Sequence, residues 1–262
     1  MSHPGRLVCL DRGVMAGLDI QAKSGVFSAC CQLKCRLNTA LSEDTMSRTP
    51  WLSIGLLVLA VSLPLAAADK APTRAQALMA ITQASADVRL VGVARLGEIG
   101  TMADADKLVA SLRDEDEKVR LYANASMWQI WSRSGDRAID ALYQRGVQQM
   151  ELSRMTEAVA TFSDIIRRKP AFAEAWNKRA TIYYLLGEYA LSLKDCDEVL
   201  KRNPQHFGAL SGYGQIYLNM GDLNQAIVYF ERALKVNPNL AGASVTIRLL
   251  RQQLQEKQDK TI

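Results

Sequence analysis

Residues 173–206 read AEAWNKRATIYYLLGEYALSLKDCDEVLKRNPQH, and residues 207–240 read FGALSGYGQIYLNMGDLNQAIVYFERALKVNPNL. Both stretches carry a proline at the same place, Pro204 and Pro238, and Pro170 precedes Pro204 by the same interval. Each proline follows one helical pattern and precedes another. A proline ends a helix because it lacks an N–H and restricts the residue before it. The spacing therefore predicts a repeated helical hairpin.

Counting from the prolines divides residues 139–240 into three units of equal length: 139–172, 173–206 and 207–240. Positions 4, 8 and 11 of each unit share one face of its first helix, and positions 20, 24 and 27 share one face of its second helix. Small residues at positions 8 and 20 let the two backbones approach, and large residues fill the remaining space. Positions 8 and 24 hold, in turn, Gly146 and Phe162, Ala180 and Cys196, and Gly214 and Phe230.

This pattern and its period of about 34 residues resemble the tetratricopeptide repeat. The resemblance implies an all-α fold, a right-handed α-solenoid of helix hairpins whose first helices line a concave groove for a protein or peptide. Residues 241–262 are expected to form a capping helix and tail, with Val245, Leu249 and Leu250 apolar among polar neighbours. Such a cap is needed because the open end of a repeat stack must face water.

A weaker duplication lies upstream of the array. Residues 88–94 (VRLVGVA) resemble residues 119–125 (VRLYANA), and each copy follows acidic residues that suit a helix N-terminus. The layout is similar to short HEAT-type repeats of phycobilisome-lyase-like proteins. We therefore expect a helical HEAT-like region at 69–137, with a plain helical cap on the array as the alternative. The polar residues 132–136 (SRSGD) are expected to join the two halves.

Residues 46–68 have the pattern of a secretory signal peptide. Arg48 gives a short positive region, residues 51–63 (WLSIGLLVLAVSL) are apolar and uncharged, and Ala66 to Ala68 form a small-residue cleavage pattern before Asp69. The apolar run is shorter than the roughly 20 residues that cross a bilayer. We therefore expect cleavage near Ala68 and a periplasmic or secreted protein, with membrane contact only through an uncleaved signal.

Residues 1–45 precede this complete signal pattern. We interpret them as a misassigned upstream segment, with Met46 as the real beginning, or as a disordered one. A small metal-binding or disulfide segment is the competing interpretation, because four cysteines fall here. The cluster Cys30, Cys31 and Cys35 lacks the paired spacing of a zinc site, which favours the first interpretation.

The composition after the leader argues against catalysis and nucleic-acid binding. Residues 1–68 hold six of the 32 basic and four of the 27 acidic residues, which leaves 26 against 23 and a net charge of +3. This balance does not give the strongly basic charge that is typical of nucleic-acid-binding proteins. Cys196 and His206 are the last cysteine and histidine, and there is no glycine-rich phosphate loop. We expect no enzyme activity, no metal and no cofactor, and a buried, apolar role for Cys196.

The family resemblance also implies which residues face the groove. These are positions 5, 9 and 12 of the units, together with position 2. Tetratricopeptide domains that grip chaperone C-termini use lysine and asparagine at positions 5 and 9, and this clamp is absent here. The candidate groove residues are Tyr143, Val147, Asn177, Thr181, Tyr184, Ser211, Gln215 and Leu218.

These observations favour an exported scaffold or adaptor that binds a partner protein or peptide through the groove. A peptidoglycan- or carbohydrate-associated accessory protein of the cell envelope is the alternative. It rests on Trp128 and Trp131, which could stack on sugars if they are exposed.

Overall fold

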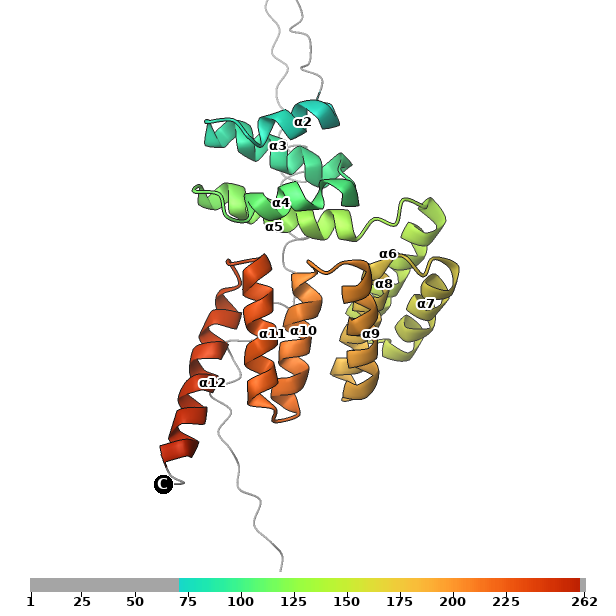
Figure 1. The fold of residues 1–262 in the computed structure, drawn as a ribbon. Helices are drawn as coiled ribbons and strands as arrows, with labels where there is room; N and C mark the ends of the chain where they lie inside the picture. The colour runs from blue at the N-terminus through green and yellow to red at the C-terminus, as the bar shows by residue number, and fades with distance from the viewer. Residues whose placement is uncertain (1–70, 260–262) are drawn as a thin grey trace, which may run out of the picture. The chain divides into compact units, whose positions relative to one another are not determined.

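The computed structural model describes residues 71–259, which form helices joined by short turns, with no strand in this range (Figure 1). All of these residues belong to one compact unit. The expected signal at 46–68 and the segment 1–45 lie outside the described residues, so both stay predictions.

The repeat array consists of three antiparallel helix hairpins, and this confirms the α-solenoid. The second helices begin at residues 155, 189 and 223, at the interval that the prolines predict. The hairpins are α6 (Arg137–Glu151) with α7 (Met155–Arg168), α8 (Ala173–Leu185) with α9 (Tyr189–Arg202), and α10 (Phe207–Asn219) with α11 (Leu223–Val236).

The expected contact between small and large residues holds the two helices of a hairpin together. A Cβ atom placed on Gly146 would lie 2.7 Å from the ring of Phe162, and one on Gly214 would lie 2.7 Å from the ring of Phe230. Both aromatic side chains are buried. The glycine at position 8 is therefore required by the ring at position 24, because no side chain fits between them.

The second unit solves the same packing problem with different residues. Ala180 and Cys196, each 2% exposed, belong to one buried cluster with Tyr213 and Ile216. The added methyl group at position 8 accompanies the smaller side chain at position 24. Burial raises the pKa of the Cys196 thiol to about 12, so the thiol stays protonated and unreactive. The expected buried, apolar role of Cys196 is confirmed.

The turns within the hairpins need a left-handed backbone. Gly187 and Gly221 have φ angles of 79° and 81°, and Ser153 takes the equivalent place in the first unit with φ 58°. This conformation costs a residue with a side chain about 1–2 kcal/mol. The first hairpin is therefore the one that closes with strain.

Two further helix pairs precede the array. They are α2 (Arg74–Ala80) with α3 (Ala86–Ile99), and α4 (Ala105–Ser111) with α5 (Glu117–Trp131). The short 3₁₀ helix η3 (Met102–Asp104) leads into α4. Helix α4 follows α2 by the same interval as α5 follows α3, and this interval is the offset of the duplicated segments. The internal duplication thus corresponds to two similar helix pairs, and their HEAT-type character stays a prediction.

Helix α12 (Ala241–Asp259) ends the stack, and it begins one repeat interval after α10. Its buried side chains include Ile247 and Leu250, which pack with residues of α11. Positions 4, 8 and 11, where a partner helix would pack, hold polar and exposed residues, and the stack therefore stops here as expected. These residues are Ser244, Arg248 and Arg251.

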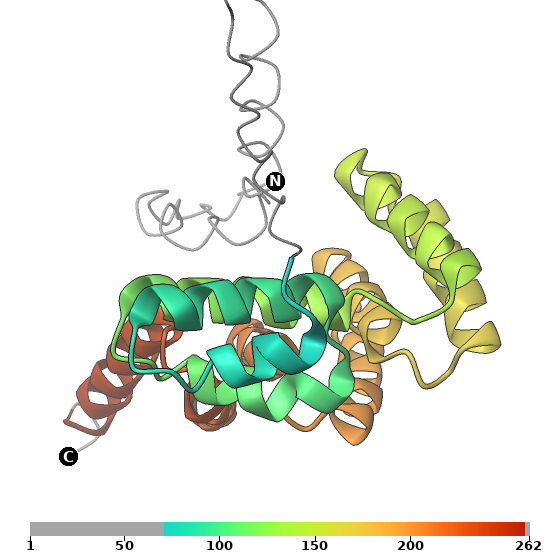
Figure 2. The same cartoon turned by 90° about the horizontal axis from the view of Figure 1, so that it is seen from above.

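The first two helix pairs and the array share a hydrophobic core. Phe207 at the start of α10 is buried in one cluster with residues of α2 to α5. Figures 1 and 2 show α5 lying across the ends of the array helices. The side chain of Asn239 donates to the carbonyl of Leu112 at 2.7 Å, and the Arg113 guanidinium donates to the carbonyls of Lys235 and Val236. These contacts join the loop between α4 and α5 to the end of α11 and the loop that follows it.

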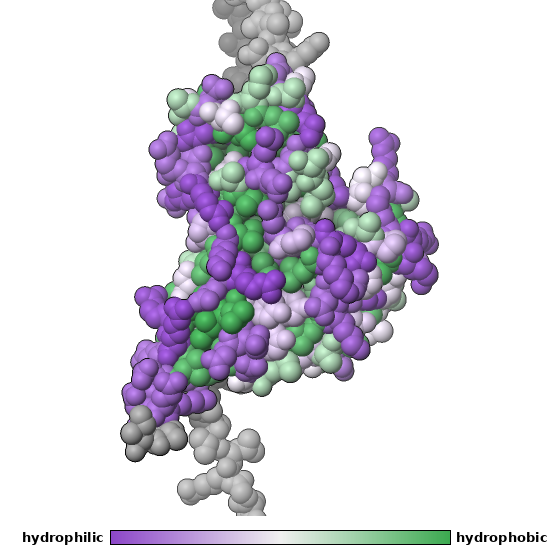
Figure 3. Space-filling view, viewed as in Figure 1, coloured by the Kyte–Doolittle hydropathy of each residue, from purple (hydrophilic) through white to green (hydrophobic). Residues whose placement is uncertain are grey.

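Within residues 71–259, no helix is both long and apolar enough to cross a bilayer. The face shown in Figure 3 mixes hydrophilic and hydrophobic areas and has no single large apolar surface.

Candidate functional site

The inner surface of the array is built by the first helices of the three hairpins. Helix α8 contacts α6 on one side and α10 on the other, so the three are neighbours. Six of the candidate groove residues keep part of their surface accessible on these helices. Thr181 is exposed, and the five that are half-buried are Val147, Tyr184, Ser211, Gln215 and Leu218.

Hydrogen bonds link the polar members of this surface across two units. Asn219 donates to the hydroxyl of Tyr184 at 3.0 Å and to that of Tyr189 at 3.3 Å, and the Gln215 amide donates to the Asn219 oxygen at 3.2 Å. The two tyrosine rings lie 6.0 Å apart. These side chains form a pre-ordered patch, so a ligand would lose less entropy in ordering them.

Two of the candidate groove residues are not accessible. Tyr143 is 3% exposed and packs with Phe162 and Phe172, and Asn177 is 8% exposed. The expectation that they line an open groove is therefore wrong. Part of the burial of Tyr143 comes from the segment that follows α5: the Ser132 hydroxyl lies 3.4 Å from that of Tyr143.

A buried polar network takes the place of an open groove there. Both Glu174 and His206 have side chains that are 0% exposed, and the ring Nε2 lies 2.9 Å from a Glu174 oxygen. The other ring nitrogen, Nδ1, accepts the backbone N–H of Ala209 at 3.0 Å. Because a backbone N–H only donates, the ring hydrogen lies on Nε2 and is donated to Glu174. The Asn177 amide and the Tyr143 hydroxyl also donate to this carboxylate.

The network keeps Glu174 ionised. Burial alone would raise the pKa of this carboxyl group, but the charge of Lys178 and the hydrogen bonds from His206 and Asn177 outweigh it, and the pKa lies below its usual value. Hydrogen bonds from Arg74 and Arg89 likewise lower the pKa values of Asp104 and Asp114, against the opposing effect of burial. These three carboxylates therefore stabilise the fold only while they are charged.

We expect the protein to lose stability in acid. A carboxyl group whose folded pKa is lowered contributes stability above its unfolded pKa, about 4, and loses that contribution as the pH falls through the folded value. The free energy of unfolding in urea should therefore fall as the pH is lowered below about 4. Glu174→Gln should flatten this dependence, and an unchanged slope in that variant would rule out Glu174 as a contributor.

The two tryptophans of α5 pack at the interface between the upstream helix pairs and the array. Trp131 is 3% exposed and stacks on the His206 ring with centroids 4.2 Å apart. Trp128 is half-buried, with its ring centroid 5.4 Å from that of Phe207. Trp131 is therefore not available for stacking on a sugar, and Trp128 keeps only part of its surface accessible.

Gly208 makes room for Trp128, and we expect Gly208→Ala to destabilise the protein. A Cβ atom at this position would lie 2.4 Å from the Trp128 ring, which itself packs edge-on against the rings of His206 and Phe207. Overpacking of this kind costs about 1–3 kcal/mol. Thermal unfolding should show a lower midpoint for Gly208→Ala than for Gly242→Ala, because Gly242 has open space around its Cβ position. Equal midpoints would contradict this packing.

The inner surface extends onto α12, for which the sequence predicted only a cap. If the repeat count continues from Ala241, Val245 takes position 5 and Leu249 takes position 9. Both side chains are exposed, by 44% and 54%. Continuing the count into the last helix would have identified these two residues.

No group of histidine, cysteine, aspartate or glutamate side chains within residues 71–259 has the arrangement of a metal site. The chemistry of the inner surface is thus that of amides, hydroxyls and apolar side chains. Such groups bind a polypeptide by hydrogen bonds and contact.

Comparison with known proteins agrees with this architecture. Models of the tetratricopeptide repeat match residues 140–170, 173–206 and 209–240. The chain is 32% identical over 150 residues to a TPR repeat-containing protein of Rhizobium etli, which covers 57% of this chain and 74% of that protein. It is 27% identical over 125 residues to the outer membrane protein assembly factor BamD of Caulobacter vibrioides, covering 46% of this chain and 37% of that protein.

Among solved structures, the first TPR domain of Spaghetti (RPAP3) bound to an HSP90 peptide is similar, with a TM-score of 0.43 and 23% identity over 44% of this chain and 92% of that chain. The helix hairpins, their period and the relative from Rhizobium etli lead to one conclusion. The chain belongs to the tetratricopeptide repeat family.

Proposed function

We propose that this protein is an exported scaffold or adaptor that holds a segment of a partner protein on the inner surface of its repeat array. Tetratricopeptide repeat proteins generally mediate protein–protein interactions. The observation that carries the proposal is the accessible patch around Tyr184, Asn219 and Gln215, which is ordered by its own hydrogen bonds.

In this proposal the binding site is the accessible part of the inner surface, formed by Val147, Thr181, Tyr184, Ser211, Gln215 and Leu218. The part of the surface at Tyr143 and Asn177 is closed, because both side chains are buried. The remaining surface combines amides and hydroxyls with the apolar side chains of Val147 and Leu218. This combination suits an extended peptide, whose backbone bonds to amides while its side chains rest on apolar area.

The proposal does not extend to chaperone C-termini. Positions 5 and 9 of the first two units hold Tyr143, Val147, Asn177 and Thr181 instead of the lysine and asparagine clamp. The carboxylate of such a terminus would find no lysine at these positions.

Export is supported by the signal pattern at 46–68 and by the similarity to an outer membrane protein assembly factor. Mass spectrometry of the protein isolated from the periplasmic fraction tests it. A mature N-terminus at or near Asp69 is expected, and a protein that retains residues 46–68 would contradict cleavage.

The binding surface is tested by comparing two variants in a pull-down from the periplasmic fraction. We expect the combined variant Thr181→Ala, Tyr184→Ala and Gln215→Ala to lose at least about 10-fold of the recovered partner, since each side chain lies on the inner surface. A matched control changes three exposed residues of the second helices, Glu157, Lys194 and Asn224, to alanine and should keep the partner. Equal recovery by the two variants would contradict binding at the inner surface.

A further inference from the structure

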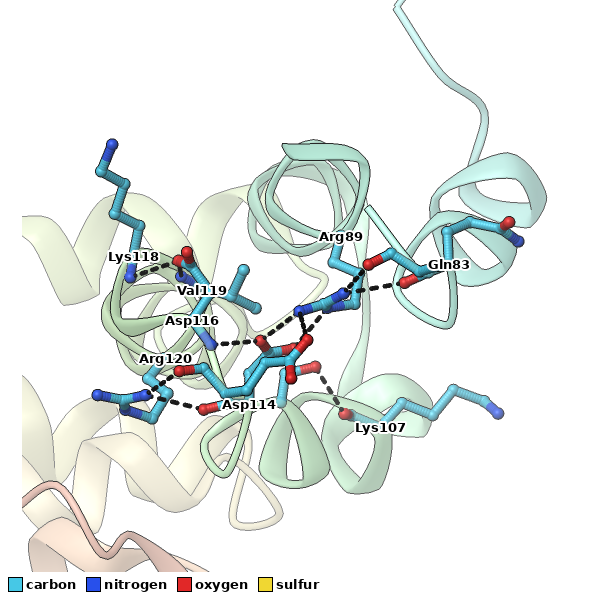
Figure 4. Close-up of polar contacts among 11 residues, drawn as sticks. Gln83, Arg89, Lys107, Asp114, Asp116, Lys118, Val119 and Arg120 are labelled. Atoms are coloured by element: carbon cyan, nitrogen blue, oxygen red, sulfur yellow. Dashed lines mark hydrogen bonds and ion pairs between the residues drawn. The ribbon is translucent and has the colours of Figure 1, made fainter. Parts of the chain in front are cut away.

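Two arginines occupy the same place in the two upstream helix pairs. Arg89 on α3 and Arg120 on α5 are separated by the same interval as the helices that carry them. Figure 4 shows both side chains reaching toward the loops that precede their helices. This internal pair allows one arginine to be compared with the other.

The two guanidinium groups are held by equivalent bonds. Nη1 of Arg89 donates to the carbonyls of Gln83 and Ala84 at 3.1 and 2.6 Å. Nη1 of Arg120 donates to the carbonyls of Asp114 and Glu115 at 2.9 and 3.0 Å. The accepting residues are again separated by that interval, so the loop carbonyls orient both groups in the same way.

The opposite edge of the guanidinium group, formed by Nε and Nη2, has different bonding partners in the two arginines. Nε and Nη2 of Arg89 bind both oxygens of Asp114, at 2.7 and 2.8 Å. This bidentate pair links the first helix pair to the second. Among residues 71–259, no carboxylate forms a hydrogen bond with Nε or Nη2 of Arg120, and the Asp114 carboxylate acts on Arg120 only through its charge.

The reason is that the regular stacking stops at this point. A third helix pair would place its loop against Arg120, as the second pair places Asp114 against Arg89. The array packs beside α5 instead. Its nearest loop bonds through Asn237, whose amide donates to Asn124 at 2.9 Å, one turn along the helix from Arg120. Residues 235–242 (KVNPNLAG) contain no acidic side chain.

We propose that Arg120 is a docking site for an aspartate or glutamate side chain of a partner protein, which binds the Nε and Nη2 edge as Asp114 binds that of Arg89. The site lies outside the inner surface of the array and does not depend on the function proposed for it.

The surroundings favour a single carboxylate over a phosphate-rich ligand. The neighbouring turn carries Glu115, Asp116 and Glu117, and the side chain of Glu115 is 85% exposed. These charges would repel a polyanion more strongly than one carboxylate. The flat fork of arginine also matches the two oxygens of a carboxylate.

The test uses the chain's own acidic turn as a probe. A peptide of residues 112–122 is added to the protein while the side-chain Nε–H signal of Arg120 is followed by NMR; the Arg120→Lys variant identifies the signal. A second peptide carries asparagine in place of Asp114, Glu115, Asp116 and Glu117. We expect a saturable shift with the acidic peptide and affinity at least about 10-fold weaker with the amide-rich peptide or with Arg120→Lys.

Lys118→Gln is the matched control, because it removes a nearby positive charge and leaves the arginine intact; its affinity should stay within about twofold. Equal shifts with both peptides, no shift of the Arg120 signal, or an equal shift caused by inorganic phosphate would overturn the proposal. The comparison of the two peptides uses the unchanged protein, so it decides the question even if Arg120→Lys folds poorly.

Discussion

His206→Ala is expected to lower the free energy of unfolding by about 3–5 kcal/mol, because it removes one partner of a fully buried pair. The Glu174 carboxylate would keep its charge but lose the donor that lies 2.9 Å away. The substitution also removes the acceptor of the Ala209 N–H and the ring on which Trp131 stacks. Urea unfolding followed by circular dichroism measures the loss.

The contribution of the pair is separated from that of packing by a double-mutant cycle. In a Glu174→Gln background the carboxylate charge is gone, and His206→Ala should cost at least about 1 kcal/mol less than it does in the original protein. His206→Asn should recover part of the loss, since asparagine also accepts a backbone N–H at a helix start. A cost of less than about 1 kcal/mol for His206→Ala would show that the buried pair does not hold the interface.

Phe230→Ala is the second substitution with a large expected effect, about 3–5 kcal/mol. The ring is 5% exposed and packs against the backbone at Gly214, which has no side chain to fill the space left behind. Val228→Ala on the same helix is the control: its side chain is 45% exposed, and a change within about 0.5 kcal/mol is expected. Equal effects of the two substitutions would contradict the assigned face of α11.

The second unit suggests a substitution at position 8 that would offset the stability lost when the ring at position 24 is removed. Phe230→Cys combined with Gly214→Ala reproduces the pair Ala180 and Cys196, so the double variant should be more stable than Phe230→Cys alone. Thermal unfolding of the two proteins compares them directly. A double variant that is less stable than the single one would show that positions 8 and 24 do not compensate each other.

The period of the prolines predicted the helix hairpins because a constant interval repeats both the helix ends and the packing face. The contact between Gly146 and Phe162 could likewise be predicted, since both residues follow from the same count. These features are local to one hairpin and its neighbours, where sequence spacing determines which side chains meet.

The closure of the upper groove could not be predicted in this way. Tyr143 and Asn177 occupy positions that face the groove in the repeat, but both side chains are buried, and the hydroxyl of Ser132, which follows α5, lies 3.4 Å from that of Tyr143. A contact between two differently built regions leaves no period in the sequence. One signal was present: position 2 holds Asp140 and Glu174 in the first two units but Gly208 in the third, where Trp128 needs the space.

The same limit applied to the buried polar network. Glu174 stands at position 2 of the second unit and His206 at its end, and no motif in the sequence links them. Their pairing follows from the stacking of one unit on the next, which brings the start of α8 beside the start of α10. In the second unit, position 2 is therefore a buried carboxylate instead of a groove residue.

Site-specific photocrosslinking in cells tests the central claim most directly, namely that the inner surface of the array holds a partner protein. A benzophenone amino acid is placed at Thr181, which is exposed on α8, or at Lys194, which is exposed on the second helix α9. The account predicts a discrete crosslinked partner from position 181 and none from position 194. Crosslinks from position 194 alone would contradict it.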